Sequence, residues 1–214
     1  MSTKFAVNMI CLIVIGSILF SASCFADVSM GIKQGDWVEY NVTCNGPVPA
    51  EHDLTWAKME YVSVQGKTAE VNITSRYTDG SEAWVILALD LEAGATGDSF
   101  LIPANLQKGD TYKEQYHGNI TILDVEQRTY AGAKRNTVHG ATTETQFYWD
   151  QQTGVLLEAR STYTDYTIDT VAQKTNIWQP ETTGIDPTVL LVLLFVLIAA
   201  IIVAVAVRLK TKRK

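Results

Sequence analysis

Apolar and polar residues alternate through most of the middle of the chain, and this period of two is typical of β-strands that bury one face. Near the start of this region Val38, Tyr40 and Val42 share one face, while polar residues take the other. The stretch 68–78 repeats the pattern and is followed by Asp79-Gly80, a strong β-hairpin signal. The sequence therefore predicts an all-β domain that is built as an antiparallel meander.

Nine or ten strands are expected, and together they would form a curved sheet, a half-open barrel or a sandwich. The stretch 84–91 is apolar on both faces, as expected for a central strand that is covered on two sides. The stretch 100–106 is expected to hold a short edge strand or a helical turn, because Pro103 keeps it out of a sheet centre. The expected strands are 36–43, 54–65, 68–78, 84–91, 111–117, 119–130, 135–139, 142–149, 155–163 and 166–178.

An apolar run near the start of the chain follows Lys4 and ends in the small-residue cluster 21–26. This order is typical of a secretory signal peptide, and we expect residues 1–26 to be one, with cleavage after Ala26. Two alternatives stay open at this point. A lipid on Cys24 would make the chain a lipoprotein, and an uncleaved segment would act as a membrane anchor.

A second apolar run, Val189 to Val207, contains no polar residue and is long enough to cross a hydrocarbon core of about 30 Å as a helix. We expect a transmembrane helix at 188–207 after a linker at 181–187. The tail 208–214 is strongly basic, which places it in the cytoplasm. The sequence thus predicts a single-pass cell-membrane protein that holds an extracytoplasmic β domain, residues 27–180, outside the cell.

The expected ectodomain is strongly acidic. All 23 acidic residues of the chain lie between Asp27 and Asp186, whereas Lys4 and the tail hold six of the 17 basic ones. Such a charge repels nucleic acid and anionic membrane surfaces, so nucleic-acid binding is not expected. The partners expected are the membrane, through the predicted span, and an envelope protein, a glycan or a lipid.

The residues that usually carry chemistry are sparse. Cys11 and Cys24 fall in the expected signal peptide, so Cys44 would be alone in the mature domain and could form no internal disulfide. The three histidines are far apart, and no metal-binding, nucleophile or phosphate-loop motif occurs. The sequence therefore predicts a protein that is not an enzyme and that has no cofactor and no metal site.

An enzymatic alternative would rest on paired carboxylates. Asp90 with Glu92, and Asp124 with Glu126, stand two residues apart, and in a strand this spacing places both side chains on one face. The separation of about 7 Å is compatible with glycoside hydrolysis. Such pairs also arise in any strand that has one wet face.

Three Asn-x-Thr triplets offer glycosylation sites, at Asn41, Asn72 and Asn119. Each lies on an expected solvent-facing side or strand start. A second repeated feature is the Gly-Asp turn, which occurs at 33–36 and again at 107–110. The repeat raises the possibility of two half-domains related by duplication.

Three stretches carry a resemblance to known proteins. Residues 33–40, with Gly35-Asp36-Trp37 and Tyr40, resemble the Gly-Asp-Trp-x-x-Tyr opening of uncharacterised, exported archaeal membrane-anchored proteins. The stretches 130–135 and 148–158, the latter with its Tyr-Trp-Asp-x-x-Thr-Gly hairpin, resemble the late hairpins of the same proteins and are similar to late hairpins in curved-sheet, lipoprotein-carrier-like domains. The resemblance implies a hairpin rich in aromatic residues and no catalytic residue. The chain lacks the Pro-Gly-Phe triplet of one archaeal sorting signal, so the C-terminal helix is expected to be retained.

Two functions are compatible with these features. The first is a non-enzymatic surface protein whose β domain binds a partner protein, a glycan or another envelope component. The alternative is a carrier or sensor of a hydrophobic, lipid-like ligand in a pocket of the curved sheet, because the domain holds more aromatic residues than hairpin pairing requires. Ordinary core packing would use the same side chains. The candidate aromatic residues are Trp37, Tyr40, Trp56, Tyr61, Trp84, Tyr148 and Trp149.

Overall fold

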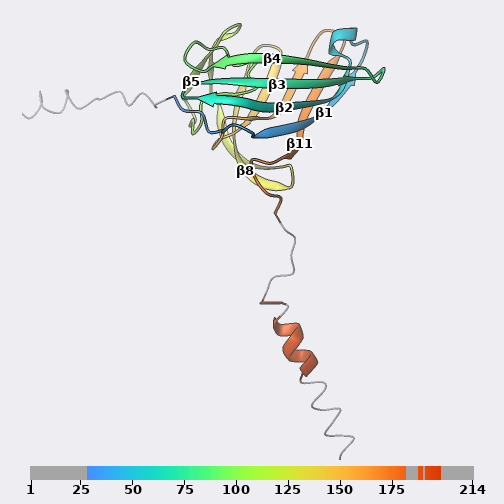
Figure 1. Ribbon diagram of the computed structural model, residues 1–214, viewed down its shortest axis with the longest axis vertical. Coiled ribbons are helices and arrows are strands. Elements are labelled where there is room, and N and C mark those ends of the chain that lie inside the picture. Colours follow the sequence, from blue (N-terminus) through green and yellow to red (C-terminus); the bar gives the residue numbers. More distant parts are fainter. Residues whose placement is uncertain (1–27, 182–187, 190, 199–214) are drawn as a thin grey trace, which may run out of the picture. The chain divides into compact units, whose positions relative to one another are not determined.

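The alternating stretches form antiparallel strands in the computed structural model, which describes residues 28–181, 188–189 and 191–198 (Figure 1). A short 3₁₀ helix, Ala50–His52, connects the first two strands. The strands are β1 Trp37–Asn45, β2 Leu54–Gln65, β3 Thr68–Tyr77, β4 Glu82–Asp90, β5 Thr111–Glu114, β6 Gly118–Thr121, β7 Asp124–Tyr130, β8 Ala133–Ala141, β9 Thr145–Asp150, β10 Leu156–Thr162 and β11 Thr167–Thr175.

Nine of these strands form one curved, open sheet in the order β4-β3-β2-β1-β11-β10-β9-β8-β7, and β5 pairs with β6 in a separate hairpin. Each pairing between neighbours is antiparallel. The prediction of an all-β antiparallel fold with a curved sheet is therefore confirmed. The sheet does not close, because β4 and β7 stand at its two ends.

The prediction that 84–91 forms a central strand is wrong, because β4 is an edge strand and most of its residues are exposed. Because residues 84–91 are apolar on both faces, the sequence predicts that other elements cover both sides of this strand. After β4 the chain turns back on itself at an isolated bridge between Asp90 and Ala95 and does not return to pair with the rest of the edge. The apolar residues at the start of β4 are thus paired with β3 on one side and have no strand of the described chain on the other.

Two further stretches differ from expectation. Residues 100–106 hold neither a strand nor a helix. Leu101 forms an isolated bridge with Val155, and the carbonyl oxygen of Phe100 accepts from the N–H of Leu156 at 3.0 Å. The expected strand 119–130 is split into β6 and β7, and Ile122 and Leu123 separate the two. The split lets β6 fold back on β5 while β7 pairs with β8.

The core lies on the inner face of the sheet, where two clusters of apolar side chains are buried. The first contains Val38, Tyr40 and Tyr61 from β1 and β2, and the second is centred on Trp149 of β9. The segment between β4 and β5 supplies buried side chains to both, among them Leu101 and Ile102. This segment and the β5–β6 hairpin therefore cover the inner face of the sheet, where burial of apolar surface stabilises the fold by about 25 cal/mol per Å².

The two Gly-Asp turns have the same local geometry. The backbone N–H of Lys33 donates to Asp36 Oδ2 at 2.9 Å, and that of Gln107 donates to Asp110 Oδ2 at 2.7 Å. The strand that follows the first turn, β1, lies inside the large sheet, whereas β5, after the second, belongs to the small hairpin. The repeat is therefore a shared turn geometry and does not extend to the strands beyond it.

The chain divides into two compact units, Met1–Trp178 and Gln179–Lys214. In the second, residues 188–189 and 191–198 are helical. No helix within the described ranges is both long and apolar enough to span a bilayer. The predicted span 188–207 includes residues 190 and 199–207, which lie outside the described residues, as do the predicted signal peptide 1–26 with Cys24, positions 182–187 of the linker, and the tail 208–214.

Candidate functional site

The seven candidate aromatic residues do not gather around one space. Tyr40, Tyr61 and Trp149 are buried in the core clusters. The other four reach the opposite side of their strands, where Trp84 is the most exposed, at 73%. Trp37, Trp56 and Tyr148 are half-buried.

Trp149 is fixed by contacts on several sides. Its indole nitrogen donates to the carbonyl oxygen of Ser99 at 2.6 Å. Its ring stacks on Phe147 with 5.1 Å between centroids and meets the edge of Tyr112 at 5.6 Å. These are the contacts of a packed core side chain whose polar atom has found a partner.

Tyr40 and Tyr61 are also core residues. The Tyr40 hydroxyl donates to the carbonyl oxygen of Leu156 at 2.9 Å, whereas the Tyr61 hydroxyl is buried without a hydrogen-bond partner among the described residues. Burial raises the pKa of both phenols well above the ordinary tyrosine range. Both side chains therefore stay neutral and packed at physiological pH.

Two of the outward-facing tryptophans are covered by cations. Lys58 Nζ lies 5.3 Å from the ring centroid of Trp37, and the Arg76 guanidinium lies 5.0 Å from that of Trp56. Arg76 also donates from Nε and Nη2 to Glu82 Oε1, at 2.9 and 2.8 Å. These cation–π contacts shield the two rings and stabilise the outer face of β1–β3 by about 0.5–1 kcal/mol each.

Tyr148 is likewise engaged with its neighbours. The Arg128 guanidinium lies 3.6 Å from its ring centroid, and the His139 ring stacks on it at 4.6 Å. Arg128 in turn donates to Glu126 at 2.7 Å and to Glu158 at 3.2 Å. The side of the sheet near β7 therefore presents a network of ion pairs in place of bare apolar surface.

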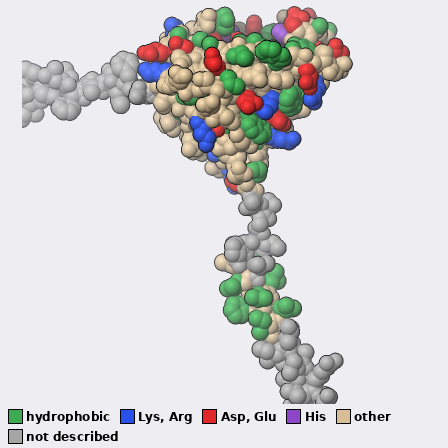
Figure 2. All heavy atoms as spheres, in the orientation of Figure 1, with side chains coloured by type: hydrophobic (Ala, Val, Ile, Leu, Met, Phe, Trp, Pro, Cys, Tyr) green, Lys and Arg blue, Asp and Glu red, His purple; other side chains and the backbone are tan. Residues whose placement is uncertain are grey.

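Trp84 differs from the other outward-facing aromatic residues, because no cation or ring of the described chain stacks on it. It is followed by Val85 and Ile86, which are 47% and 55% exposed. Trp84 and Ile86 stand opposite Thr74 and Asn72 of β3. Figure 2 shows hydrophobic side chains at the surface over the strands that include β4. Contiguous exposed apolar residues of this kind mark interaction sites in soluble domains.

The backbone at this edge is also free. The hydrogen bonds Tyr77 N to Ser81 O, at 3.0 Å, and Leu91 N to Lys67 O, at 3.1 Å, show that odd-numbered residues of β4 bond to β3. Even-numbered residues therefore direct their N–H and C=O groups away from the sheet. Of these, Asp90 is bonded to Ala95, at 2.8 and 2.9 Å. The free edge consequently runs from Glu82 to Ala88.

The opposite edge of the sheet is protected. The sequence of β7, Asp-Val-Glu-Gln-Arg-Thr-Tyr, carries charges of both signs, and Glu126 and Arg128 are paired. Charged side chains on an edge strand discourage pairing with another chain. β4 has one charge along its free edge, Glu82, and this is held by Arg76. The two edges thus differ in chemistry, and β4 is the open one.

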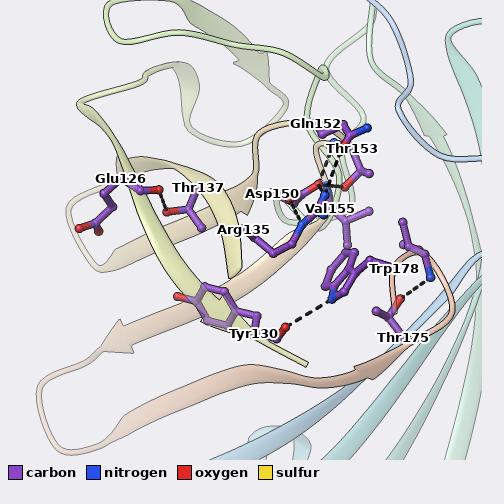
Figure 3. Close-up of polar contacts among 11 residues, drawn as sticks. Glu126, Tyr130, Arg135, Thr137, Asp150, Gln152, Thr153, Val155, Thr175 and Trp178 are labelled. Atoms are coloured by element: carbon purple, nitrogen blue, oxygen red, sulfur yellow. Dashed lines mark hydrogen bonds and ion pairs between the residues drawn. The ribbon is translucent and has the colours of Figure 1, made fainter. Parts of the chain in front are cut away.

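An ion pair between Arg135 of β8 and Asp150 of β9 organises the turn that leads into β10 (Figure 3). Arg135 donates to both carboxylate oxygens of Asp150, at 2.8 and 3.0 Å, and Asp150 is 1% exposed. Asp150 Oδ2 also accepts from the backbone N–H and the hydroxyl of Thr153, at 3.0 and 2.7 Å. The Arg135 guanidinium lies 4.7 Å from the Trp178 ring, whose nitrogen donates to the carbonyl oxygen of Tyr130.

Two open hollows, of about 330 and 320 Å³, border this ion pair and share Arg135 and Gln152 in their walls. The guanidinium is satisfied by Asp150 and by Gln152 Oε1, at 3.1 Å. The Tyr-Trp-Asp-x-x-Thr-Gly motif therefore has a structural role here, because the Asp150 carboxylate binds both Arg135 of β8 and Thr153 of the β9–β10 turn. It does not present an unpaired cation to a ligand.

The carboxylate pairs of the enzymatic alternative are engaged elsewhere. Asp90 Oδ1 accepts from the backbone N–H groups of Glu92 and Ala93, at 2.9 and 3.0 Å, and so closes the turn after β4. Asp124 Oδ1 accepts from the N–H of Val125 at 2.8 Å, while Glu126 is paired with Arg128. Each pair has a local structural role.

Other candidate groups are separate from one another. The Cys44 thiol is half-buried and donates to the carbonyl oxygen of His52 at 3.2 Å, and burial raises its pKa. Asn41 and Asn119 are exposed, whereas Asn72 is half-buried and its Oδ1 has no partner in the described part of the chain. No cluster of metal-ligating side chains occurs in that part.

The free edge of β4 is the site that sequence reasoning missed. The sequence predicts Trp84 as a candidate aromatic residue but places it in a strand that is covered on two sides. The available signal was the stretch 91–110, in which Gly94, Gly97 and Pro103 interrupt any strand pattern. An irregular stretch of that length leaves β4 without a following hairpin partner.

Comparison with known proteins adds little. No family model matches the chain, and comparison with curated proteins gives no match. Among solved structures, one match is the siderocalin Ex-FABP, described as functioning through dual ligand specificities. It is 10% identical and covers 78% of this chain and 82% of its own, with a TM-score of 0.25. A similarity at that TM-score supports no argument about fold or ligand, and the resemblance to archaeal surface proteins stays a prediction.

Proposed function

We propose that this chain is a non-enzymatic, membrane-tethered surface protein whose β domain binds a partner protein at the free edge of β4. The observation that carries the proposal is the run Trp84-Val85-Ile86. It is exposed on both faces of an edge strand whose outward backbone groups are unbonded within the described chain. The tether is the predicted C-terminal span.

The expected mode of binding is the addition of a partner strand to the sheet. In this mode main-chain hydrogen bonds supply affinity, and alternate side chains supply specificity. Trp84 and Ile86 would contact the partner on the outer face and Val85 on the inner one. Tryptophan is one of the residue types that are enriched among the residues that dominate binding energy at protein interfaces.

Two observations favour this function over a carrier of a hydrophobic ligand. Tyr40, Tyr61 and Trp149 are packed into the core, so they are not available to line an open pocket. The hollow of about 330 Å³ beside Arg135 and Asp150 is lined by polar and charged residues. A lipid-like ligand requires apolar walls.

The test is site-specific photo-crosslinking in the intact, membrane-bound protein. A benzophenone side chain in place of Trp84 is expected to give a cross-linked product of defined mass after irradiation. Val62 on β2, which is 38% exposed and lies away from the edge, is the matched control position and is expected to give none. Equal yields at the two positions, or no product at either, would contradict the proposed function.

A further inference from the structure

We propose that the partner at the β4 edge is a second copy of this chain, paired antiparallel about a twofold axis through Val85. This inference rests on the proposed function, because it names the partner of the same site. It is argued from the strand's own sequence, from its backbone pattern and from the length of edge that is free.

The backbone pattern limits the possible registers. Outward-directed N–H and C=O groups belong to Glu82, Trp84, Ile86 and Ala88, since odd-numbered residues bond to β3. Two antiparallel copies can exchange hydrogen bonds only between outward-directed residues. A twofold axis at Val85 satisfies this condition, because it places Trp84 opposite Ile86 of the second copy and Glu82 opposite Ala88.

The length of the free edge selects among these registers. Asp90 is already bonded to Ala95, so the edge ends at Ala88. With the axis at Val85, all four outward-directed residues of each copy find a partner. An axis at Ile86 would require Asp90 to pair with Glu82, and an axis at Trp84 would place Ala88 against the turn at Gly80.

The side chains agree with the same register. On the outer face each Trp84 would lie beside an Ile86 of the other copy, and on the inner face Val85 would meet Val85. Ala83 would stand opposite Leu87. Apolar residues thus meet apolar residues at every central position, and cross-strand pairs of this kind stabilise a sheet by about 0.2–1 kcal/mol each.

The charges agree as well. Glu82 would face Ala88 and is already paired with Arg76 of its own copy, so no acid would meet an acid. The pairing would add about eight backbone hydrogen bonds, from four pairs with two bonds each, which is within the range of ordinary protein interfaces.

The test uses the full-length protein in mild detergent and in membranes, with cysteine placed at the proposed axis. At a non-hydrogen-bonded antiparallel pair the Cα atoms are about 4.5 Å apart, which suits a disulfide. Val85→Cys is therefore expected to give a disulfide-linked dimer under mild oxidation. Ala83→Cys is the matched control, because its Cα would lie roughly 14 Å from its own symmetry mate. The parent protein, oxidised in the same way, is the control for cross-links through the native cysteines.

A second variant tests the interface without oxidation. Val85→Lys places like charges at the axis and is expected to weaken dimerisation, measured by light scattering, at least about tenfold. Val62→Lys changes an exposed valine away from the edge and is expected to leave the dimer intact.

The outcomes separate this inference from the proposed function. A dimer that is cross-linked by Val85→Cys and not by Ala83→Cys supports it. A monomer whose Trp84 photo-adduct contains a different protein would overturn the second copy while leaving the proposed function in place. A monomer without any adduct would overturn both, and equal cross-linking through residues 83 and 85 would reject the register.

Discussion

At the scale of single residues, the hydroxyl groups of Tyr40 and Tyr61 differ in what they contact. Both rings are buried, but among the described residues only the Tyr40 hydroxyl has an acceptor, the carbonyl oxygen of Leu156. Leaving a buried polar atom without a partner costs about 1–3 kcal/mol. The core near β2 therefore keeps a polar atom that weakens it.

This difference predicts opposite effects of the same substitution. Tyr61→Phe removes the unpartnered hydroxyl and is expected to raise the free energy of unfolding by about 1 kcal/mol. Tyr40→Phe removes a hydrogen bond and is expected to lower it by about the same amount. Urea denaturation of the two variants and the parent measures both changes. The interpretation fails if Tyr61→Phe destabilises the protein as much as Tyr40→Phe.

The residue scale also shows where sequence reasoning stops. The alternation of apolar and polar residues correctly placed Val38 and Tyr40 on the buried face of β1. It could not distinguish Tyr40, which packs in the core, from Trp84, which projects into solvent. Both are aromatic residues in stretches that predict strands, and what separates them is the element that lies across from each.

At the scale of elements, the turn between β9 and β10 is held against the segment 100–106. Gly154 has a φ of +75°, and its carbonyl oxygen accepts from the N–H of Ile102 at 2.9 Å. A Cβ atom at Gly154 would collide with the backbone oxygen of Ile102. Gly109 also has a positive φ, of +91°, but has open space around it.

These two glycines form a matched pair for substitution. Gly154→Ala is expected to reduce the free energy of unfolding by more than about 3 kcal/mol, because both backbone strain and a collision must be relieved. Gly109→Ala is expected to cost about 1 kcal/mol, from backbone strain alone. Thermal and urea denaturation of both variants tests this. Similar losses in the two proteins would show that the close approach at Gly154 is not a constraint.

Elements were predicted better than their arrangement. The limits of β2 match the expected stretch 54–65, because Gly66 supplies a turn after a long alternating run. The place of β4 at the edge was not predicted, since periodicity reports which faces are buried and not which strand lies beside which. β4 is an edge strand because the segment after it, residues 91–110, is irregular and forms no neighbouring strand. The sequence shows that this segment is irregular, but it does not show the path that the segment takes.

At the scale of the whole molecule, the first and last strands of the domain meet. β1 pairs with β11, and Asn176 accepts from the N–H of Trp37 at 2.8 Å and donates to the carbonyl oxygen of Gly35 at 2.9 Å. This seam joins the β1–β4 half of the sheet to the β7–β11 half. Because the seam takes up β1 and β11, the strands left at the ends are β4 and β7. Of these, β7 carries charges of both signs along its edge, whereas the free edge of β4 carries Glu82 alone.

The tether of the domain is the remaining prediction for the whole chain. If residues 188–207 span the bilayer, the full-length protein should stay with membranes during alkaline carbonate extraction. A chain that ends at Glu181 should be released into the aqueous fraction after export, because it lacks the apolar run.

The same experiment separates the tether from lipidation. Cys24→Ser should leave membrane retention of the full-length chain unchanged, since the predicted span alone holds it. Retention of the shortened chain that is lost on Cys24→Ser would instead assign the anchor to a lipid on that cysteine. Retention of the shortened chain that survives Cys24→Ser would indicate that the N-terminal segment stays as the anchor. In either of those cases the C-terminal run would not be required for attachment, and the prediction that it alone holds the chain to the membrane would be wrong.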